Sequence, residues 1–211
     1  MRRIGIDLDG TVADYMAGAV PALKEHYGLE PNFAVKAYTI EEVFGLTTET
    51  RPPNMRQTLY IEDNLFAKLP PLEHDNHLLP LHLRRNLGPD IKIYFVTARN
   101  NHPVIRSDTL GWLNQNMDTF DDVFHVQDKA EFCKLAGIQV MIEDEVRQIV
   151  GLINAGIDVI MRDQPWNQHL PIDPHGLEDR KGHLTRIHNW REMVEVAKEY
   201  YNGFNESKKS T

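Results

Sequence analysis

Hydrophobic residues along this chain gather in short runs, and longer stretches with helical spacing separate these runs. Short runs that are rich in β-branched and aromatic side chains are typical of strands buried on both faces. Such runs lie at residues 4–8, 91–96, 123–126, 139–142 and 158–161, and a last apolar stretch lies at residues 184–187. The alternation of strands and helices, joined by short turns, predicts an α/β fold with a doubly wound, mostly parallel, Rossmann-like sheet.

The predicted helices begin and end at residues typical of helix ends. Gly28, Gly88 and Gly156 end three of them, and glycine is common directly after a helix. Before the last helix, Asn189 and Glu192 form a capping-box pattern. The predicted ranges are 13–27, 75–87, 104–116, 146–155 and 190–204, with a further helix that begins at residue 129.

Residues 29–72 break this pattern, because prolines separate short helical pieces there and no stretch resembles a strand of a parallel sheet. One piece opens with the capping-box pattern of Thr39 and Glu42. We therefore predict a small helical cap inserted after the first strand. The predicted division is a core of residues 1–14 and 75–204, a cap of residues 15–74 and a flexible tail of residues 205–211.

The composition is that of an ordinary globular protein, and it narrows the choice of partners. Of 211 residues, 41% are hydrophobic and 26% charged, and this length suits one α/β domain with a modest insertion. The net charge of −8 argues against nucleic acid and anionic membranes, because both bind clustered Lys and Arg. No bilayer-spanning run or signal-peptide pattern is seen, so we expect a cytoplasmic protein. A homodimer is left open.

Cysteine and histidine offer no strong metal-binding pattern. Cys133 is the single cysteine, which excludes an internal disulfide and a thiolate metal site. Its helical spacing favours packing in the core over a role as a nucleophile. The ten histidines are scattered without a His-x-x-x-His pair, so we do not expect a zinc site.

Two carboxylates, Asp7 and Asp9, follow the first predicted strand and lie on the same side of its end, because side chains alternate along a strand. Carboxylates this close repel, so one must take up a proton or a cation must lie between them. Mg²⁺ meets that need, since it binds one or two carboxylates and shares its other positions with water and phosphate oxygens. Gly10 allows a sharp turn after the strand, and Thr11 adds a hydroxyl group.

Further candidate residues follow the later strands: Thr97 and Ala98 after the second, Lys129 after the third, and Glu143 with Asp144 after the fourth. The carboxyl ends of the strands are where such sheets bind ligands. A phosphoryl-transfer site needs a nucleophile, a general acid, groups that hold the phosphate and a carboxylate that completes the metal shell. Singly, each residue has a structural explanation, such as a helix cap or an acidic first turn. Their occurrence together, in this order along the chain, supports a functional role.

The order and types of these residues resemble the four motifs of the haloacid dehalogenase (HAD) superfamily of phosphohydrolases, over residues 1–14 and 75–165. The resemblance implies that Asp7 is the nucleophile that forms an aspartyl-phosphate, and that Asp9 protonates the leaving oxygen and then activates water. Carbon–halogen cleavage needs no acid for its leaving group, so Asp9 points to phosphate chemistry. The other implied roles are phosphate binding by Thr97, Ala98 and Lys129, and Mg²⁺ binding by Asp7, the backbone carbonyl of Asp9 and Asp144.

Segments around these motifs resemble the deoxyribonucleotidase-like branch, the 5′-nucleotidase group that contains the deoxy (pyrimidine) nucleotidases. In that group the fourth motif is usually Asp-Asp, and here it is Glu143 followed by Asp144. The acid implied as the metal ligand is kept, whereas the first acid is one methylene longer. The resemblance implies a (deoxy)nucleoside monophosphate as substrate. The segments are residues 95–99, 141–144, 163–167 and 186–190.

In that group the cap closes on the nucleoside, and aromatic residues of the predicted cap are candidates for stacking on a base. We expect each of them instead to pack in the cap's own core, because so small a unit needs them. Arg99 either lies near the phosphate or pairs with an acid of the neighbouring helix, and Trp166 either lines the rim or packs in the core. The aromatic candidates are Tyr15, Phe33, Tyr38, Phe44, Tyr60 and Phe66.

The sequence thus predicts a Mg²⁺-dependent phosphomonoester hydrolase that acts through an aspartyl-phosphate and is most like a 5′(3′)-deoxyribonucleotidase. One alternative is a HAD phosphatase for another small phosphometabolite, such as a sugar phosphate. Another is a HAD-like binding protein without turnover, which the complete set of motif residues argues against.

Overall fold

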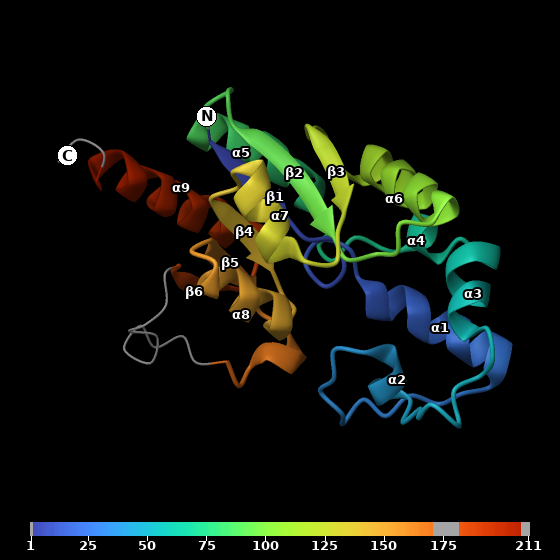
Figure 1. Cartoon of the computed structure of the whole chain (residues 1–211). Coiled ribbons are helices and arrows are strands. Elements are labelled where there is room, and N and C mark those ends of the chain that lie inside the picture. The colour runs from blue at the N-terminus through green and yellow to red at the C-terminus, as the bar shows by residue number, and fades with distance from the viewer. Residues whose placement is uncertain (1, 171–181, 208–211) are drawn as a thin grey trace.

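The computed structural model describes residues 2–170 and 182–207, and in this part of the chain six strands form one sheet. Neighbouring strands run parallel, in the order β3-β2-β1-β4-β5-β6 (Figure 1). This confirms the predicted α/β class and the doubly wound sheet. The sequence pattern left β6 as an unassigned apolar stretch. The strands are β1 (Arg3–Ile6), β2 (Lys92–Thr97), β3 (Asp122–His125), β4 (Val140–Glu143), β5 (Asp158–Arg162) and β6 (Leu184–Ile187).

The strand order reverses direction in the middle of the sheet, between β1 and β4. The chain adds β2 and β3 on one side of β1, and β5 and β6 on the far side of β4. Ile6 at the end of β1 pairs with Phe95 of β2 and with Ile142 of β4, so the carboxyl ends of these three strands lie level. Such a reversal opens a crevice at the carboxyl edge, where sheets of this kind bind ligands.

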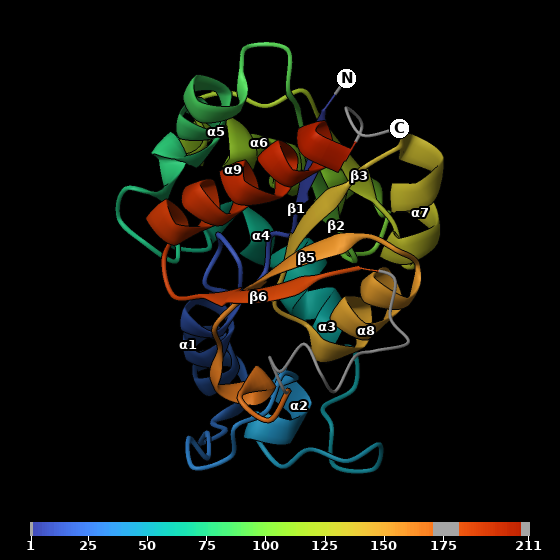
Figure 2. The ribbon, with the colours of Figure 1, turned by 90° about the vertical axis from the view of Figure 1, so that its left-hand side faces the viewer.

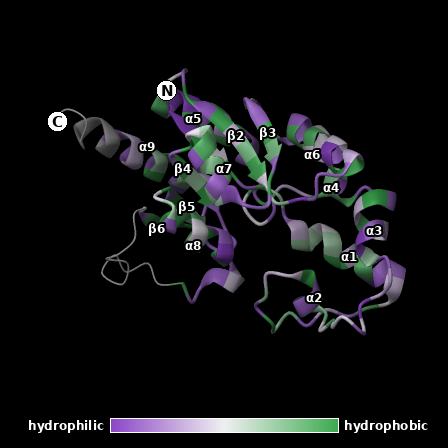
Figure 3. Ribbon diagram, viewed as in Figure 1, coloured by the Kyte–Doolittle hydropathy of each residue, from purple (hydrophilic) through white to green (hydrophobic). Residues whose placement is uncertain are grey.

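Helices cover both faces of the sheet (Figure 2). Alternate strand residues point to opposite faces: Ile142 and Ile160 join one hydrophobic cluster, and Met141 and Met161 join the other. In Figure 3 the green, hydrophobic residues recur along the strands. Cys133 lies fully buried in the second cluster, which confirms that it packs in the core. The covering helices are α5 (Leu79–Leu87), α6 (Pro103–Asn116) and α9 (Trp190–Ser207) on the first cluster, and α7 (Lys129–Ala136) and α8 (Val146–Asn154) on the second.

The last helix, α9, is capped as predicted and is longer than predicted. The Asn189 side chain accepts a hydrogen bond from the backbone N–H of Glu192 at 3.0 Å, and the Glu192 carboxylate accepts one from the N–H of His188 at 2.7 Å. The helix continues to Ser207, so the predicted end at residue 204 was wrong. Gly203 does not end it, because glycine inside a helix costs only about 1 kcal/mol. The rest of the predicted tail, residues 208–211, lies outside the described residues.

The segment between β1 and β2 is helical, and it leaves and rejoins the sheet at one place. The backbone N–H of Asp14 donates to the Pro70 carbonyl at 2.9 Å, and the N–H of Leu72 donates to the Val12 carbonyl at 2.8 Å. The capping box at Thr39 is present. In Figure 1, α1, α2 and α3 lie beyond the carboxyl ends of the strands. The helical elements are α1 (Tyr15–Tyr27), α2 (Ile40–Val43), α3 (Met55–Gln57), the π-helical turn η1 (Thr58–Glu62), α4 (Leu65–Lys68) and the 3₁₀ turn η2 (Asn76–Leu78).

Helix α4 of this segment packs against α6 of the core. The indole N–H of Trp112 in α6 donates to the Leu69 carbonyl at 2.7 Å, and the Asn64 side-chain amide contacts both Asp108 carboxylate oxygens at 3.3 Å. The segment is therefore fixed to the core at α4. We propose that residues 15–74 nevertheless form a cap on the core of residues 1–14 and 75–204. Among the described residues, no helix is both long enough and apolar enough to span a membrane.

Candidate active site

The loop that follows β1 carries Asp7 to the point where the strand order reverses. The N–H of Asp7 donates to the Ile142 carbonyl at 2.9 Å, so the ladder with β4 continues one residue past the strand. Gly10 then turns the chain with a φ of +80°, and a Cβ atom there would lie 2.3 Å from Asp144 Oδ2. Glycine is required at this position for both reasons, since a side chain would be strained and would collide with a carboxylate.

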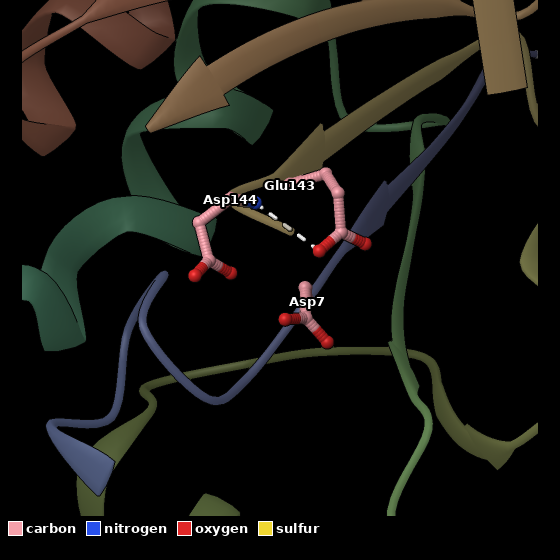
Figure 4. Close-up of side chains that lie close together, drawn as sticks. All are labelled: Asp7, Glu143 and Asp144. Carbon is pink, nitrogen blue, oxygen red and sulfur yellow. Dashed lines mark hydrogen bonds between the residues drawn. The ribbon is translucent and has the colours of Figure 1, made fainter. Parts of the chain in front are cut away.

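Three buried carboxylates converge at this edge: Asp7 after β1, Glu143 at the end of β4, and Asp144 directly after it (Figure 4). Each offers one oxygen, and these oxygens lie within 4.8 Å of one another. Asp144 accepts hydrogen bonds from the Thr11 hydroxyl at 3.2 Å and from the Trp166 indole N–H at 3.1 Å. Oxygen ligands of this kind suit a hard divalent cation.

Lys129 balances part of this negative charge. It lies in the first turn of α7, and its ammonium donates to Asp7 Oδ1 at 2.6 Å and to Glu143 Oε2 at 2.7 Å. Burial lowers the pKa of Lys129, but the carboxylates of Asp7 and Glu143 outweigh that effect and raise it above its usual value. The side chain is buried, so Lys129 is not a solvated residue at a helix start.

The pKa values of the acids reflect this crowding. Burial, together with the charge of Glu143, raises the pKa of Asp7 to about 7, although Lys129 opposes the rise. Burial and the charge of Asp7 raise the pKa of Asp144 well above its usual range. Ionisation of two of the three acids therefore costs free energy, and a bound cation would lower that cost.

Asp9 lies outside this cluster and has a different partner. Arg99 donates from Nε to Asp9 Oδ2 at 2.8 Å and from an NH2 group to Oδ1 at 2.6 Å, which is a two-pronged ion pair. Arg99 thus pairs with an acid, as one alternative expected, but that acid belongs to the loop after β1 and not to a neighbouring helix. The structure brings Asp7 and Asp144 together and holds the Asp9 side chain apart from them.

Thr97 ends β2 beside these acids, and Ala98 follows it directly. Thr97 is buried, and its hydroxyl accepts a hydrogen bond from the backbone N–H of Arg99 at 3.2 Å. The Ala98 carbonyl accepts one from the Gln127 side chain at 2.6 Å. Both residues line the same cavity as Asp7, Asp9 and Lys129. All the residues predicted for catalysis and phosphate binding therefore line this one cavity. Asp144, the predicted metal ligand, lies next to Gly10, which also lines it.

The cavity has a volume of about 1230 Å³ and runs from Asp7 into the helical segment after β1. Phe66 packs on Tyr60 with ring centroids 4.8 Å apart, as expected for a small core. That expectation is wrong for Phe33, which is 75% exposed beside the cavity. Tyr38 meets Trp166 edge-on at 5.9 Å, so Trp166 lines the rim. Of the six aromatic candidates in the predicted cap, five line the cavity: Tyr15, Phe33, Tyr38, Tyr60 and Phe66.

Sequence reasoning missed two features of the site. It did not assign Glu143 to the acid cluster, although the adjacent acid Asp144 was a signal. It also did not foresee that η3 (Pro165–Asn167) supports Asp144, where Asn167 donates from its side chain to the Asp144 carbonyl at 3.0 Å. The signal there was the position of this segment just after β5, at the same edge of the sheet.

Sequence similarity to known proteins covers most of the chain. The family model described as 5′ nucleotidase, deoxy (Pyrimidine), cytosolic type C protein matches residues 1–200. The chain belongs to this nucleotidase family. Membership makes it a hydrolase that acts as a phosphatase or nucleotidase, which confirms the predicted enzyme class, and its fold is HAD-like.

Relatives of this nucleotidase family member agree with that assignment. The protein named "Putative nucleotidase YqfW" from Bacillus subtilis is 27% identical over 201 residues, which cover 92% of this chain and 93% of the relative. L-2-haloacid dehalogenase from Xanthobacter autotrophicus superposes with a TM-score of 0.56 at 13% identity, over 93% of this chain and 98% of that one. The magnesium-bound "putative HAD-hydrolase YfnB" from Bacillus subtilis gives a TM-score of 0.52 at 18% identity, over 92% and 97%. The two solved structures support the fold.

Proposed function

We propose that this nucleotidase is a Mg²⁺-dependent phosphomonoester hydrolase that releases phosphate from (deoxy)nucleoside monophosphates through an aspartyl-phosphate on Asp7. The observation that supports this most is the meeting of Asp7, Glu143, Asp144 and Lys129 at the strand-order reversal, beside a cavity of about 1230 Å³. The family description, which names deoxy and pyrimidine 5′ nucleotidases, supports the substrate class. The word cytosolic in the family description supports a cytoplasmic location.

The donor set fits Mg²⁺. Asp7, Asp144 and the backbone carbonyl of Asp9 would hold the ion, all through oxygen atoms, and the burial and mutual repulsion that raise the pKa values of Asp7 and Asp144 favour a cation at this point. When bound, Mg²⁺ supplies positive charge that offsets the charge of the phosphoryl oxygens. A magnesium-bound structure among the solved HAD folds is consistent with this choice.

The chain's own residues would then divide the chemistry between two carboxylates. A carboxylate oxygen of Asp7 attacks phosphorus, the bond from phosphorus to the ester oxygen breaks, and Asp9 gives its proton to that oxygen. In the second half Asp9 takes a proton from water, whose oxygen attacks the phosphorus of the aspartyl-phosphate and frees Asp7. Lys129 uses two of its three N–H bonds on carboxylates, which leaves one for a phosphoryl oxygen next to Thr97 and Ala98.

The helical segment would bind the nucleoside. Phe33 and Tyr38 are exposed beside the cavity, and stacking of a base on an aromatic side chain is worth about 1–3 kcal/mol. Tyr38 faces Trp166 across the rim, so a planar base would find aromatic surface on both the cap side and the core side.

The test is phosphate release from a panel of deoxyribonucleoside and ribonucleoside monophosphates and sugar phosphates, with Mg²⁺ and with excess chelator. We expect turnover of nucleoside monophosphates that chelator removes. Asp7→Asn should abolish turnover while it keeps the fold, because an amide is no phosphoryl acceptor. Preference for sugar phosphates would overturn the proposed substrate, and full activity in chelator would overturn the proposed metal.

A further inference from the structure

Arg99 lies in the wall of the cavity and is held there on several sides. Its guanidinium donates to both carboxylate oxygens of Asp9, and its NH1 group donates to the Thr109 hydroxyl at 3.1 Å. That hydroxyl in turn donates to the Ile105 carbonyl of α6 at 2.7 Å. The guanidinium carbon lies 4.3 Å from the ring centroid of Phe66 in α4, which is a cation–π distance.

This burial argues against Arg99 as a ligand for the substrate phosphate. Both residues line the cavity, but the Arg99 side chain is only 1% exposed, whereas that of its partner Asp9 is 22% exposed. Each nitrogen of the guanidinium already donates to Asp9 or Thr109, so its hydrogen bonds are directed at these two residues. Arg99 therefore acts on the reaction through Asp9.

Within residues 2–170 and 182–207, the hydrogen bonds to the Asp9 carboxylate come from Arg99. Without them, this partly exposed side chain has two rotatable bonds and no fixed orientation. A planar guanidinium holds both oxygens of a carboxylate in one plane, which an ammonium does not do. The contacts with Thr109 and Phe66 fix the guanidinium itself.

We propose that Arg99 is a positioning residue that sets the direction of the Asp9 carboxyl group, and that Phe66 of α4 supports it. The proposal rests on the proposed function, because it concerns the proton that Asp9 gives to the leaving oxygen and the proton that it takes from water. A misdirected carboxyl group slows both transfers and leaves the binding of phosphate unchanged. The expected mark of Arg99 is therefore a loss in kcat with little change in KM.

The experiment is a double-mutant cycle between Arg99→Lys and Asp9→Asn, measured on a nucleoside monophosphate and on p-nitrophenyl phosphate with Mg²⁺. General acid–base catalysis contributes about 10²–10⁴-fold, so Asp9→Asn should slow the nucleotide reaction by that order. Arg99→Lys should slow it by about 10–10²-fold, since a small misplacement of a catalytic group has an effect of that size. Both losses should shrink for p-nitrophenyl phosphate, whose leaving group needs no proton.

The decisive result is the double variant. If Arg99 acts through Asp9, Arg99→Lys should cause no further loss once Asp9 is asparagine, because interacting residues are not additive. Arg106→Lys is the matched control, since Arg106 is an exposed arginine of α6 that contacts Asn101, and it should keep full activity. Phe66→Leu, which leaves the arginine in place, should give a smaller loss in kcat of the same kind. It replaces Arg99→Lys in the experiment if thermal melting shows that Arg99→Lys does not fold.

Additive losses, or an Arg99→Lys loss equal for both substrates, would overturn this inference and leave the proposed function standing. Such a result would mean that Arg99 only ties the loop after β1 to α6. Wild-type turnover in Asp9→Asn would instead overturn the role of Asp9 in the proposed function, and the inference with it.

Discussion

Two acids separated by one residue, Asp7 and Asp9, lie in different surroundings. Asp7 is buried against Lys129 and Glu143, and its pKa is raised to about 7. Asp9 faces the cavity and is held by Arg99. The pattern Asp-x-Asp specifies neither partner. The different roles of the two acids are therefore set by the residues that the fold places beside each of them.

Asp121 offers a test of the same electrostatics away from the site. Burial would raise its pKa, but hydrogen bonds from Lys92, Ile93 and Arg84 outweigh burial and hold the pKa below the ordinary value of 3.8. A carboxyl with a depressed pKa in the folded state stabilises the protein above its unfolded pKa. That stability is lost as pH falls through the folded value.

We therefore predict that Asp121→Asn lowers the free energy of unfolding by about 1–3 kcal/mol at pH 7, because hydrogen bonds to charged groups are lost. The difference from the wild type should narrow as pH falls below about 3.8, where the carboxyl begins to be protonated. Urea unfolding at several pH values measures it. Asp118→Asn, at an exposed acid nearby, is the control and should change little. A difference that stays constant with pH would contradict the prediction.

At the scale of elements, the helical segment after β1 has a fixed end and an exposed end. Its α4 packs on α6 through Trp112 and Asp108. The stretch before α2 instead presents Phe33 and Tyr38 to solvent beside the cavity. We infer that α4 belongs mechanically with the core and that the stretch before α2 selects the substrate.

Tyr38→Ala should raise KM for a nucleoside monophosphate by about 5–150-fold, because it removes an aromatic surface worth about 1–3 kcal/mol per stacked base. It should leave kcat for p-nitrophenyl phosphate within about twofold, since the reacting groups are untouched. Steady-state kinetics on the two substrates measures this. Phe44→Leu, at a packed aromatic outside the cavity lining, is the control. An equal change for both substrates would place the effect of Tyr38 on the chemistry instead.

At the scale of the whole molecule, the metal site exists only in the folded chain. Asp7 follows the first strand and Asp144 follows the fourth, and the pairing of β1 with β4 makes them neighbours. A ligand that binds only the folded state stabilises it, by about 2.7 kcal/mol at one hundred times its Kd.

We predict that saturating Mg²⁺ raises the Tm by about 5–10 °C, since 1 kcal/mol shifts a domain of this size by about 2–4 °C. Asp144→Asn should remove most of this shift and keep the fold, because the amide is isosteric and stays near Thr11 and Trp166. Differential scanning calorimetry with and without Mg²⁺ measures it. Glu145→Gln, at a neighbouring acid outside the cluster, should keep the shift. An equal shift in Asp144→Asn would place the metal elsewhere.

Local features were predicted well from the sequence, since they depend on neighbours along the chain. The capping box at Thr39 is present, Asn189 caps α9, and the buried strands occur where β-branched runs lie. The predicted end of α9 was wrong because the first residues of the predicted polar tail, 205–207, continue the helix.

Order along the chain was enough to predict the class of the fold and the strand ends at which polar residues gather, because periodicity and the carboxyl-edge rule depend on that order alone. The partners of these residues depend on the tertiary structure. Asp9 meets Arg99 across 90 positions, and Asp7 meets Lys129 across 122. Phe33 is exposed for the same reason, since burial depends on which distant elements cover a residue. No local pattern encodes these contacts, because strand register and helix packing set them.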